Sequence, residues 1–269
     1  MLVKYSTAYG NVAYNLSRPH IIISLSGGFD SAVTFYGLAK AIHENGTGNE
    51  IHSITVRKLS NKRGDTKFDK ANPFPIVAQL IEWVRSQFPD VKIHDNVTAL
   101  VHEWWEDEFK YTQVQYDLLD QIAQEYGPEN VLTTSGMTMN PPLVVGEVTV
   151  TDDNGNSIRQ NALTERDEIS EVVIPGTIST RSQCDGREEF YPFRNFDKRA
   201  VFSFADTYYG DVDTFLNMTR SCEGFRRHTN NFTGVCGAGP DLDYKCWWCY
   251  EREWATMQYQ KDKENGFHP

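Results

Sequence analysis

The chain has 269 residues and a formal net charge of −11, from 26 Lys and Arg against 37 Asp and Glu. This charge argues against a protein whose main partner is bulk nucleic acid, because phosphate binding requires a cationic face. A 39% hydrophobic and 13% aromatic content excludes a disordered chain. No apolar run approaches the ~20 residues of a membrane span. We therefore expect a cytoplasmic globular protein without a membrane partner, built as one large domain or one domain plus an appendage.

The first half of the chain alternates predicted strands with predicted helices. Hydrophobic periodicity predicts strands at 20–25, 51–56, 91–94 and 131–134, and helices at 32–43, 73–88, 98–110 and 113–126. The segment 1–19 shows no strong period, and 57–72 is typical of a polar loop. The alternation predicts βαβ units and therefore a parallel sheet covered on both faces. In such sheets ligands bind beyond the carboxyl ends of the strands.

The pattern changes after the fourth predicted strand. Residues 144–163 predict a β-hairpin with an Asn-Gly turn, which we interpret as an insertion. Helical character returns from about Lys198, and a final helix is predicted over 247–263. We therefore expect an α/β domain over 1–215, carrying the hairpin, followed by a small C-terminal helical segment over 216–269.

The segment Ser26-Gly27-Gly28-Phe29-Asp30-Ser31 directly follows the first predicted strand of the βαβ pattern. Two glycines allow a sharp turn and a close backbone approach to a ligand, and the next helix directs its free N–H groups at the loop. This pattern favours phosphate binding, with Asp30 either helping to hold Mg²⁺ or capping the helix. It is neither a Walker A motif nor G-x-G-x-x-G. An ordinary strand–turn–helix connection is the alternative.

The S-G-G-x-D-S sequence after a first strand resembles the PP-loop of the N-type ATP pyrophosphatases. The resemblance implies an adenine-nucleotide α-hydrolase-like fold and an enzyme that cleaves ATP to AMP and pyrophosphate while adenylating an oxygen. It implies that Mg²⁺ and ATP are held by the loop residues Ser26, Gly27, Gly28, Asp30 and Ser31. It also implies adenine and ribose near Thr55 and Val56, and a nucleotide contact from Gly136 in the segment 135–140, which could equally be an ordinary loop.

Four of the five cysteines cluster near the C-terminal end of the sequence, at Cys222, Cys236, Cys246 and Cys249. The terminal C-x-x-C and two outlying thiolates can complete a tetrahedral Zn²⁺ site with a structural role. Three alternatives are a site in which His228 replaces one cysteine, buried free thiols, and a redox C-x-x-C.

The cysteine cluster also resembles the C-terminal end of the 7-cyano-7-deazaguanine synthase (QueC) family within that superfamily. There a first Cys precedes a C-G-x-C-x-x-C run followed by Arg. Here Cys236-Gly237, Cys246, Cys249 and Arg252 match, with 237–245 as an insertion. Pro192 and Lys198 fit the segment upstream of the run.

This closer resemblance implies a ligase that converts 7-carboxy-7-deazaguanine and ammonia to 7-cyano-7-deazaguanine, as in queuosine biosynthesis. Asp30, Ser31 and Lys198 would be catalytic, with Lys198 stabilising phosphate or an intermediate; a surface lysine is the alternative. The family's expected segment after the fourth strand is absent, and Pro141-Pro142 and the hairpin stand in its place. The substrate therefore stays open.

Other functions fit the same residues. These are a related PP-loop enzyme that ligates another carboxylate or thiolates tRNA, and a nucleotide-binding protein that has lost catalysis. The expected partners are a small deazapurine-type molecule and ammonia, and the assembly is either a monomer or a homodimer.

Overall fold

The computed structural model describes residues 1–60, 72–103, 109–139, 147–151, 157–161, 176–178, 182–184, 187–220 and 247–267. Cys222, Cys236 and Cys246, three of the four predicted zinc ligands, lie outside these ranges, as does Asn140. The fourth, Cys249, lies in a described helix, but its side chain is outside the description.

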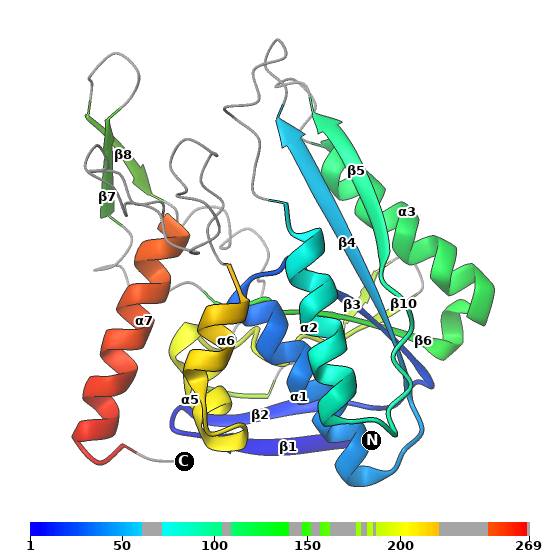
Figure 1. The fold of residues 1–269 in the computed structure, drawn as a ribbon, viewed down its shortest axis with the longest axis horizontal. Helices are drawn as coiled ribbons and strands as arrows, with labels where there is room; N and C mark the ends of the chain where they lie inside the picture. The colour runs from blue at the N-terminus through cyan, green and yellow to red at the C-terminus, as the bar shows by residue number, and fades with distance from the viewer. Residues whose placement is uncertain are drawn as a thin grey trace.

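A six-stranded sheet, in the order β5-β4-β3-β6-β10-β9, lies at the centre of the described residues (Figure 1). Its members are β3 (His20–Ser24), β4 (Glu50–Ser60), β5 (Val97–Glu103), β6 (Val131–Ser135), β9 (Ser182–Cys184) and β10 (Arg187–Glu189). The first five strands in this order run parallel, and β9 is antiparallel to β10. The predicted α/β, Rossmann-like parallel sheet is confirmed.

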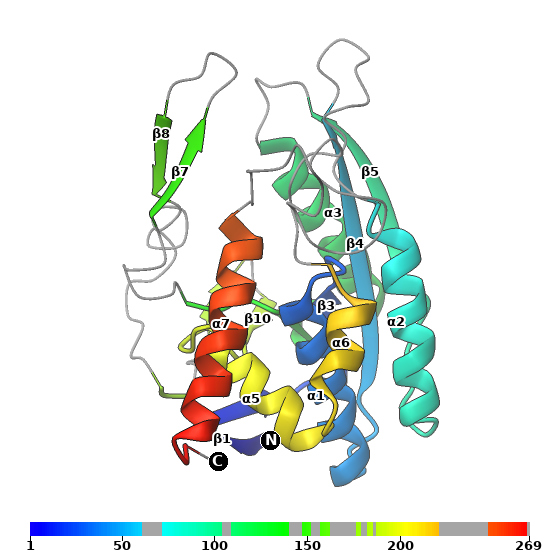
Figure 2. The same cartoon turned by 60° about the vertical axis from the view of Figure 1, so that its left-hand side comes forward.

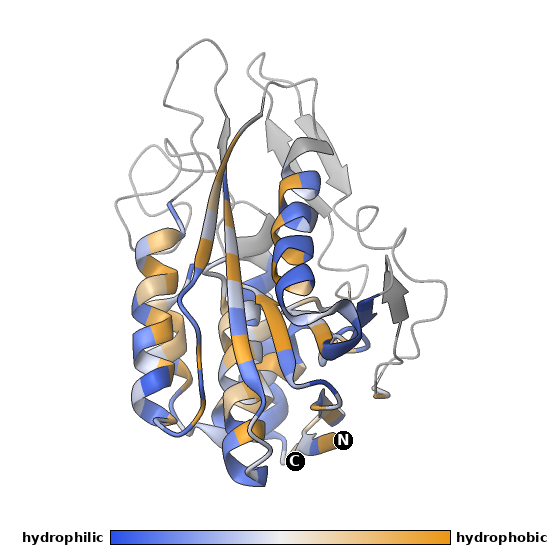
Figure 3. Ribbon diagram, turned by 90° about the vertical axis from the view of Figure 1, so that its right-hand side faces the viewer, coloured by the Kyte–Doolittle hydropathy of each residue, from blue (hydrophilic) through white to orange (hydrophobic). Residues whose placement is uncertain are grey.

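Helices cover both faces of this sheet (Figures 1 and 2). The described helices are α1 (Phe29–Asn45), α2 (Phe74–Gln87), α3 (Phe109–Tyr126), the short η2 (Pro128–Asn130), α5 (Lys198–Tyr208), α6 (Val212–Met218) and α7 (Trp247–Glu264). Ile21 and Ile23 of β3 pack into the core with α1 and α2, whereas Ile22 packs with α3. Apolar residues accordingly concentrate on the strands and on the helix sides turned toward them (Figure 3). Burial on both faces explains why this strand is a continuous apolar run.

An N-terminal antiparallel pair, β1 (Leu2–Thr7) and β2 (Gly10–Asn15), occupies the segment for which no element was predicted. Its aromatic side chains join the core: the ring centroid of Tyr5 lies 5.4 Å from that of Phe204 in α5. Tyr14 lies so close to Gly37 of α1 that a Cβ at Gly37 would fall 2.0 Å from the tyrosine hydroxyl oxygen. Glycine at position 37 therefore lets α1 pack against the strand pair.

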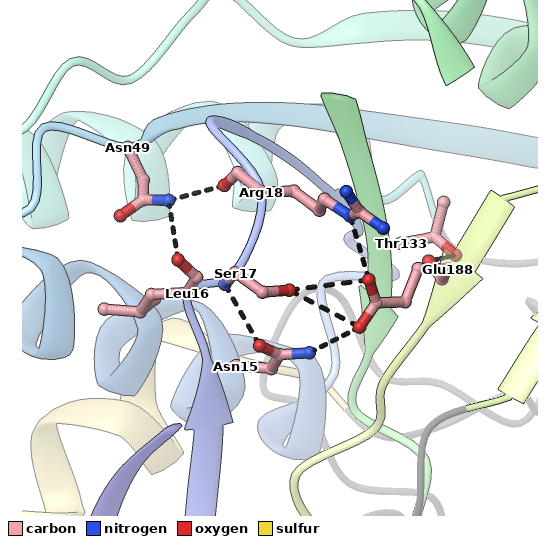
Figure 4. Close-up of polar contacts among 7 residues, drawn as sticks. All are labelled: Asn15, Leu16, Ser17, Arg18, Asn49, Thr133 and Glu188. Atoms are coloured by element: carbon pink, nitrogen blue, oxygen red, sulfur yellow. Dashed lines mark hydrogen bonds and ion pairs between the residues drawn. The ribbon is translucent and has the colours of Figure 1, made fainter. Parts of the chain in front are cut away.

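The carboxylate of Glu188 in β10 ties this N-terminal pair to the sheet (Figure 4). It accepts hydrogen bonds from the Asn15 amide at 2.9 Å, the Arg18 guanidinium at 2.9 Å and the Ser17 hydroxyl at 3.4 Å. Glu188 is buried, and a buried carboxylate needs such partners. The network fixes the start of β3 relative to β10.

Two predictions for the β4–β5 region are wrong. The third parallel strand is β5 (Val97–Glu103), not 91–94, which makes only an isolated bridge between Ile93 and Ile51. A helix was predicted over 98–110, but residues through Glu103 are extended because β4 continues to Ser60 and offers them a full partner. The alternation of exposed Leu100 with buried Val101 is that of a half-buried strand.

Strands β7 (Glu147–Thr151) and β8 (Ser157–Asn161) pair antiparallel where a hairpin was predicted over 144–163. The turn between them is outside the described residues. That this pair is an insertion, and that a boundary falls between 215 and 216, remain predictions. Among the described helices, none is long and apolar enough to cross a membrane.

Candidate phosphate-binding site

The glycine-rich loop connects β3 directly to α1 at the carboxyl edge of the sheet. The Leu25 N–H donates to the Ile54 carbonyl at 2.9 Å, which keeps the chain on the sheet until the loop begins. Gly27 then takes a φ of +75°, and Gly28 is the residue before the first turn of α1. A left-handed φ strongly favours glycine at position 27. The first-turn N–H groups of α1, which have no partner within the helix, therefore face the loop.

Two serine hydroxyls fold back onto this loop. Ser26 Oγ accepts from the Gly28 N–H at 3.2 Å and lies 3.2 Å from Ser31 Oγ, which itself donates to the Gly28 carbonyl at 3.0 Å. Phe29 is fully buried and anchors the helix start in the core. The sequence-predicted loop residues are thus preorganised in a tight turn with hydroxyl and N–H groups together.

Gly136, which follows β6, is pressed against the loop. A Cβ at Gly136 would lie 2.3 Å from the Ser31 backbone nitrogen and 2.6 Å from its Cα. These are backbone atoms and cannot yield as the end of a side chain could, so the contact requires glycine. The structure therefore brings Gly136 to the predicted loop, although its contact with a nucleotide remains a prediction.

The loop lies where the strand order of the sheet diverges. From β3 the chain passes through α1 to β4 on one side, whereas β6 lies on the other side of β3. Ligands of open parallel sheets bind at such a point. Thr55 and Val56 of β4 lie one strand away at the same edge. The Thr55 hydroxyl is buried and hydrogen-bonded to the Asn96 amide at 3.0 Å, so β4 is held in place at the level where β3 ends.

Lys198 is buried beside the loop. It is 1% exposed, and its Nζ lies 3.0 Å from Asp30 Oδ2 and 2.8 Å from Glu251 Oε2. Asp197 caps the helix that begins at Lys198 by accepting from the Arg199 N–H at 3.0 Å. The alternative that Lys198 is a surface lysine is wrong, whereas its role in catalysis remains a prediction.

Glu251 is a member of this group that sequence reasoning missed. It is fully buried and comes from α7, far along the chain from the loop. A buried carboxylate requires a cation or hydrogen-bond donors, and Lys198 supplies the cation. No local pattern marks such a residue, because its partner is in another helix.

Two further contacts connect the C-terminal helices to the loop, one directly and one through α6. The Arg220 N–H donates to the Gly27 carbonyl at 2.7 Å. The Arg252 guanidinium donates to the Leu216 carbonyl at 2.8 Å, at the end of α6, where a cation complements the helix dipole. The position of α7, and with it Glu251, is therefore fixed relative to the loop.

The charges of the buried group suit a divalent cation better than a bare anion. Asp30 and Glu251 bring two carboxylates and Lys198 one ammonium to the side of the loop. Carboxylate oxygens are the ligands that Mg²⁺ prefers, and Mg²⁺ is commonly shared between a carboxylate and substrate phosphates. Asp30 therefore fits a role beside Mg²⁺ bound to phosphate.

No protein-family model and no curated protein matches the chain. Among solved structures, it is similar to NMN synthetase from Francisella tularensis (15% identity, 74% of this chain and 65% of that chain, TM-score 0.37). It is also similar to the U34-tRNA thiolase NcsA from Methanococcus maripaludis with its 4Fe–4S cluster (12% identity, 92% of this chain and 67% of that chain, TM-score 0.37). A third similar structure is NAD⁺ synthetase from Burkholderia pseudomallei (11% identity, 94% of this chain and 83% of that chain, TM-score 0.36).

The matched part of this chain thus spans slightly less than two thirds of the NMN synthetase. Inference about function depends on this chain's own site.

Proposed function

We propose that this chain is a Mg²⁺- and ATP-dependent adenylating enzyme that cleaves ATP to AMP and pyrophosphate. The observation that carries the proposal is the glycine loop 26–31 at the start of α1, with Gly136 packed against it at the carboxyl edge of the sheet. N–H groups gathered at a helix N-terminus are suited to phosphate, and the close approach of Gly136 leaves backbone rather than side chain beside the loop.

In this proposal each residue has a physical task. The N–H groups of the loop and of the first turn of α1 stabilise the negative charge that develops on pyrophosphate as it leaves. Asp30 is the residue that would hold Mg²⁺, which supplies charge neutralisation of the phosphates. Lys198 keeps the Asp30 carboxylate in one orientation, and Thr55 and Val56 form the edge that receives adenine and ribose. Most of the rate enhancement comes from positioning.

The substrate that we propose is 7-carboxy-7-deazaguanine, converted with ammonia to the nitrile 7-cyano-7-deazaguanine. Support for this comes from the sequence, where the run from Cys222 to Arg252 resembles that of the deazaguanine synthases. The same resemblance supports Zn²⁺ at Cys222, Cys236, Cys246 and Cys249. Four thiolates are a donor set that suits structural zinc.

The test is to incubate the purified protein with Mg²⁺·ATP, ammonium and 7-carboxy-7-deazaguanine and to follow nucleotides and bases by mass spectrometry. We expect AMP and the nitrile. Replacing Asp30 and Ser31 by Ala should abolish AMP release, whereas Ser86→Ala, at an exposed serine on α2, should leave it unchanged. AMP without nitrile, formed with another carboxylate, would move the proposal to that substrate. If the protein binds ATP but forms no AMP with any acceptor, the proposal that it is a catalyst is contradicted.

A further inference from the structure

A second polar cluster lies at the opposite, amino edge of the sheet. His20 is the first residue of β3, and it pairs in register with Glu50, the first residue of β4. His52 follows Glu50 by two residues and therefore points to the same face. Segment 92–94 runs beside β4, because the Ile51 N–H donates to the Lys92 carbonyl and the His94 N–H to the Ile51 carbonyl. Strand periodicity thus places imidazoles and a carboxylate from three neighbouring segments together.

The side chains in this cluster converge closely. His20 Nδ1 lies 3.2 Å from His52 Nε2 and 3.8 Å from Glu50 Oε2. Ligand atoms of all three residues lie within 4.8 Å of one another. His94 Nε2 lies 2.7 Å from the same Glu50 oxygen, and its ring stacks on that of His52 with centroids 4.0 Å apart.

The surroundings keep the cluster in place. The ring of Tyr126, at the end of α3, lies 4.1 Å from the ring of His20 and 4.7 Å from that of His52. His52 is 5% exposed, whereas His20, Glu50 and His94 are half-buried, so the cluster has a dry inner side and an outer side open to solvent. Lys92 pairs with the other oxygen of Glu50, Oε1, at 2.9 Å.

We propose that His20, Glu50 and His52 bind a divalent transition-metal ion, most suitably Zn²⁺, with His94 as a fourth ligand or as the donor that orients Glu50. Imidazole nitrogens and one carboxylate oxygen are a donor set typical of Zn²⁺, with distances of ~2.0–2.2 Å. Two ligands on one tetrahedral ion at such distances lie about 3.4 Å apart. The separations of 3.2 Å and 3.8 Å are close to this value.

The ion would join β3, β4 and the 91–94 segment at the edge away from the phosphate loop. Its role is therefore structural: it fixes the amino ends of the neighbouring strands β3 and β4. The site differs from the proposed cysteine site in donor type, since nitrogen and oxygen donors give a metal signature that thiolates do not.

The test uses the full-length protein stripped with EDTA and then titrated with Co²⁺. Bound equivalents are counted by elemental analysis after dialysis. We expect wild type and His43→Gln, a control at an exposed histidine of α1, to bind one more equivalent than His20→Gln. The affinity of that equivalent should fall at least ~10–100-fold in Glu50→Gln, as for the loss of an oriented ligand. Circular dichroism checks that each variant is folded.

X-ray absorption on the metal-loaded wild type makes the test independent of the variants. A population of metal with only nitrogen and oxygen neighbours would support the site. Metal with sulfur neighbours alone, or equal binding by wild type, His20→Gln and Glu50→Gln, would overturn it. Neither measurement uses ATP turnover, so the outcome is distinct from that of the proposed activity.

Discussion

Lys198 Nζ and Asp30 Oδ2 lie 3.0 Å apart, which joins the N-terminal end of α5 to the first turn of α1. Glu251 of α7 binds the same ammonium at 2.8 Å. Three helices from distant parts of the sequence therefore meet at one buried cation beside the phosphate loop. The geometry of the loop therefore depends on contacts with residues from other parts of the sequence.

The first prediction concerns this buried cation. Lys198→Met leaves the Asp30 and Glu251 carboxylates without their shared ammonium, and removing one partner of a buried ion pair costs about 3–5 kcal/mol. We expect the free energy of unfolding, measured in urea, to fall by this amount. Lys40→Met, which breaks only the surface pair with Glu44, should cost less than about 1 kcal/mol.

A double variant separates charge from packing. Lys198→Met with Glu251→Gln removes one negative charge together with the positive charge, so it should be more stable than Lys198→Met alone. If the effects of the two substitutions on the free energy of unfolding were simply additive, the loss of the ion pair would not be the source of the destabilisation.

The second prediction concerns the contact between Gly136 and the loop. Gly136→Ala forces the loop backbone away from its position, which we expect to lower AMP release by on the order of 100-fold. Overpacking should also reduce stability by about 1–3 kcal/mol. The measurements are AMP formation and urea unfolding of the same preparation.

Gly210→Ala is the matched control for this prediction. Gly210 has a φ of +83° and open space around it, so alanine costs about 1–2 kcal/mol of backbone strain without touching the loop. This variant should lose stability but keep its AMP release. Full activity in Gly136→Ala would show that the contact does not matter for the loop.

The third prediction concerns the docking of α7 on α5. Asp206 Oδ2 accepts from the Tyr259 hydroxyl at 2.6 Å and from Lys263 Nζ at 2.7 Å. Burial raises the pKa of Asp206, but these hydrogen bonds outweigh it and hold the pKa below its usual value. Because the folded pKa is below the unfolded one, the stabilisation is present above about pH 4 and is lost as the pH falls through the folded pKa.

Asp206→Asn should therefore destabilise the protein by about 1 kcal/mol at pH 7. The difference from wild type should shrink as the pH falls below about 4, where Asp206 of the unfolded protein becomes protonated, and should go on shrinking through the lower folded pKa. Urea unfolding at a series of pH values measures this. A difference that stays constant down to pH 3 would mean that the charge of Asp206 does not contribute.

The fourth prediction concerns the proposed cysteine site. Cys249→Ser should bind one equivalent of zinc less than wild type, because three thiolates hold the ion less tightly than four. Cys184→Ser, at the cysteine outside the cluster, should bind as much as wild type. Elemental analysis of freshly purified protein measures both, and zinc retained in full by Cys249→Ser would contradict the assignment.

Local patterns were sufficient to predict the parallel sheet and the loop. Three consecutive isoleucines followed by Gly27-Gly28 indicate a strand buried on both faces and then a sharp turn, and both are confirmed. Strand β2 gave no signal because Val12, Ala13 and Tyr14 are all buried, so the two-residue alternation of a half-exposed strand is absent. Strand β5 was predicted as helix because its partner is an extension of β4 that no local pattern indicates.

Local sequence predicted only the part of the candidate site whose residues are adjacent, whereas Gly136 and Lys198 were named from the family resemblance alone. Ser26 to Ser31 form one motif, but Glu251 reaches the site through the packing of α7 on α5. The closeness of Gly136 to Ser31 results from strand order, with β6 beside β3. Such contacts are set by tertiary structure, and a short motif carries no information about them.

The meeting of α1 and α7 at Lys198 has a consequence for biosynthesis. The loop and its aspartate are translated before α1 is complete, whereas Glu251 is translated only after the six described strands of the sheet. A nascent chain that stops before α7 therefore holds Lys198 with one carboxylate partner fewer. The surroundings of the loop are therefore completed only when α7 has been translated, after the six described strands of the sheet.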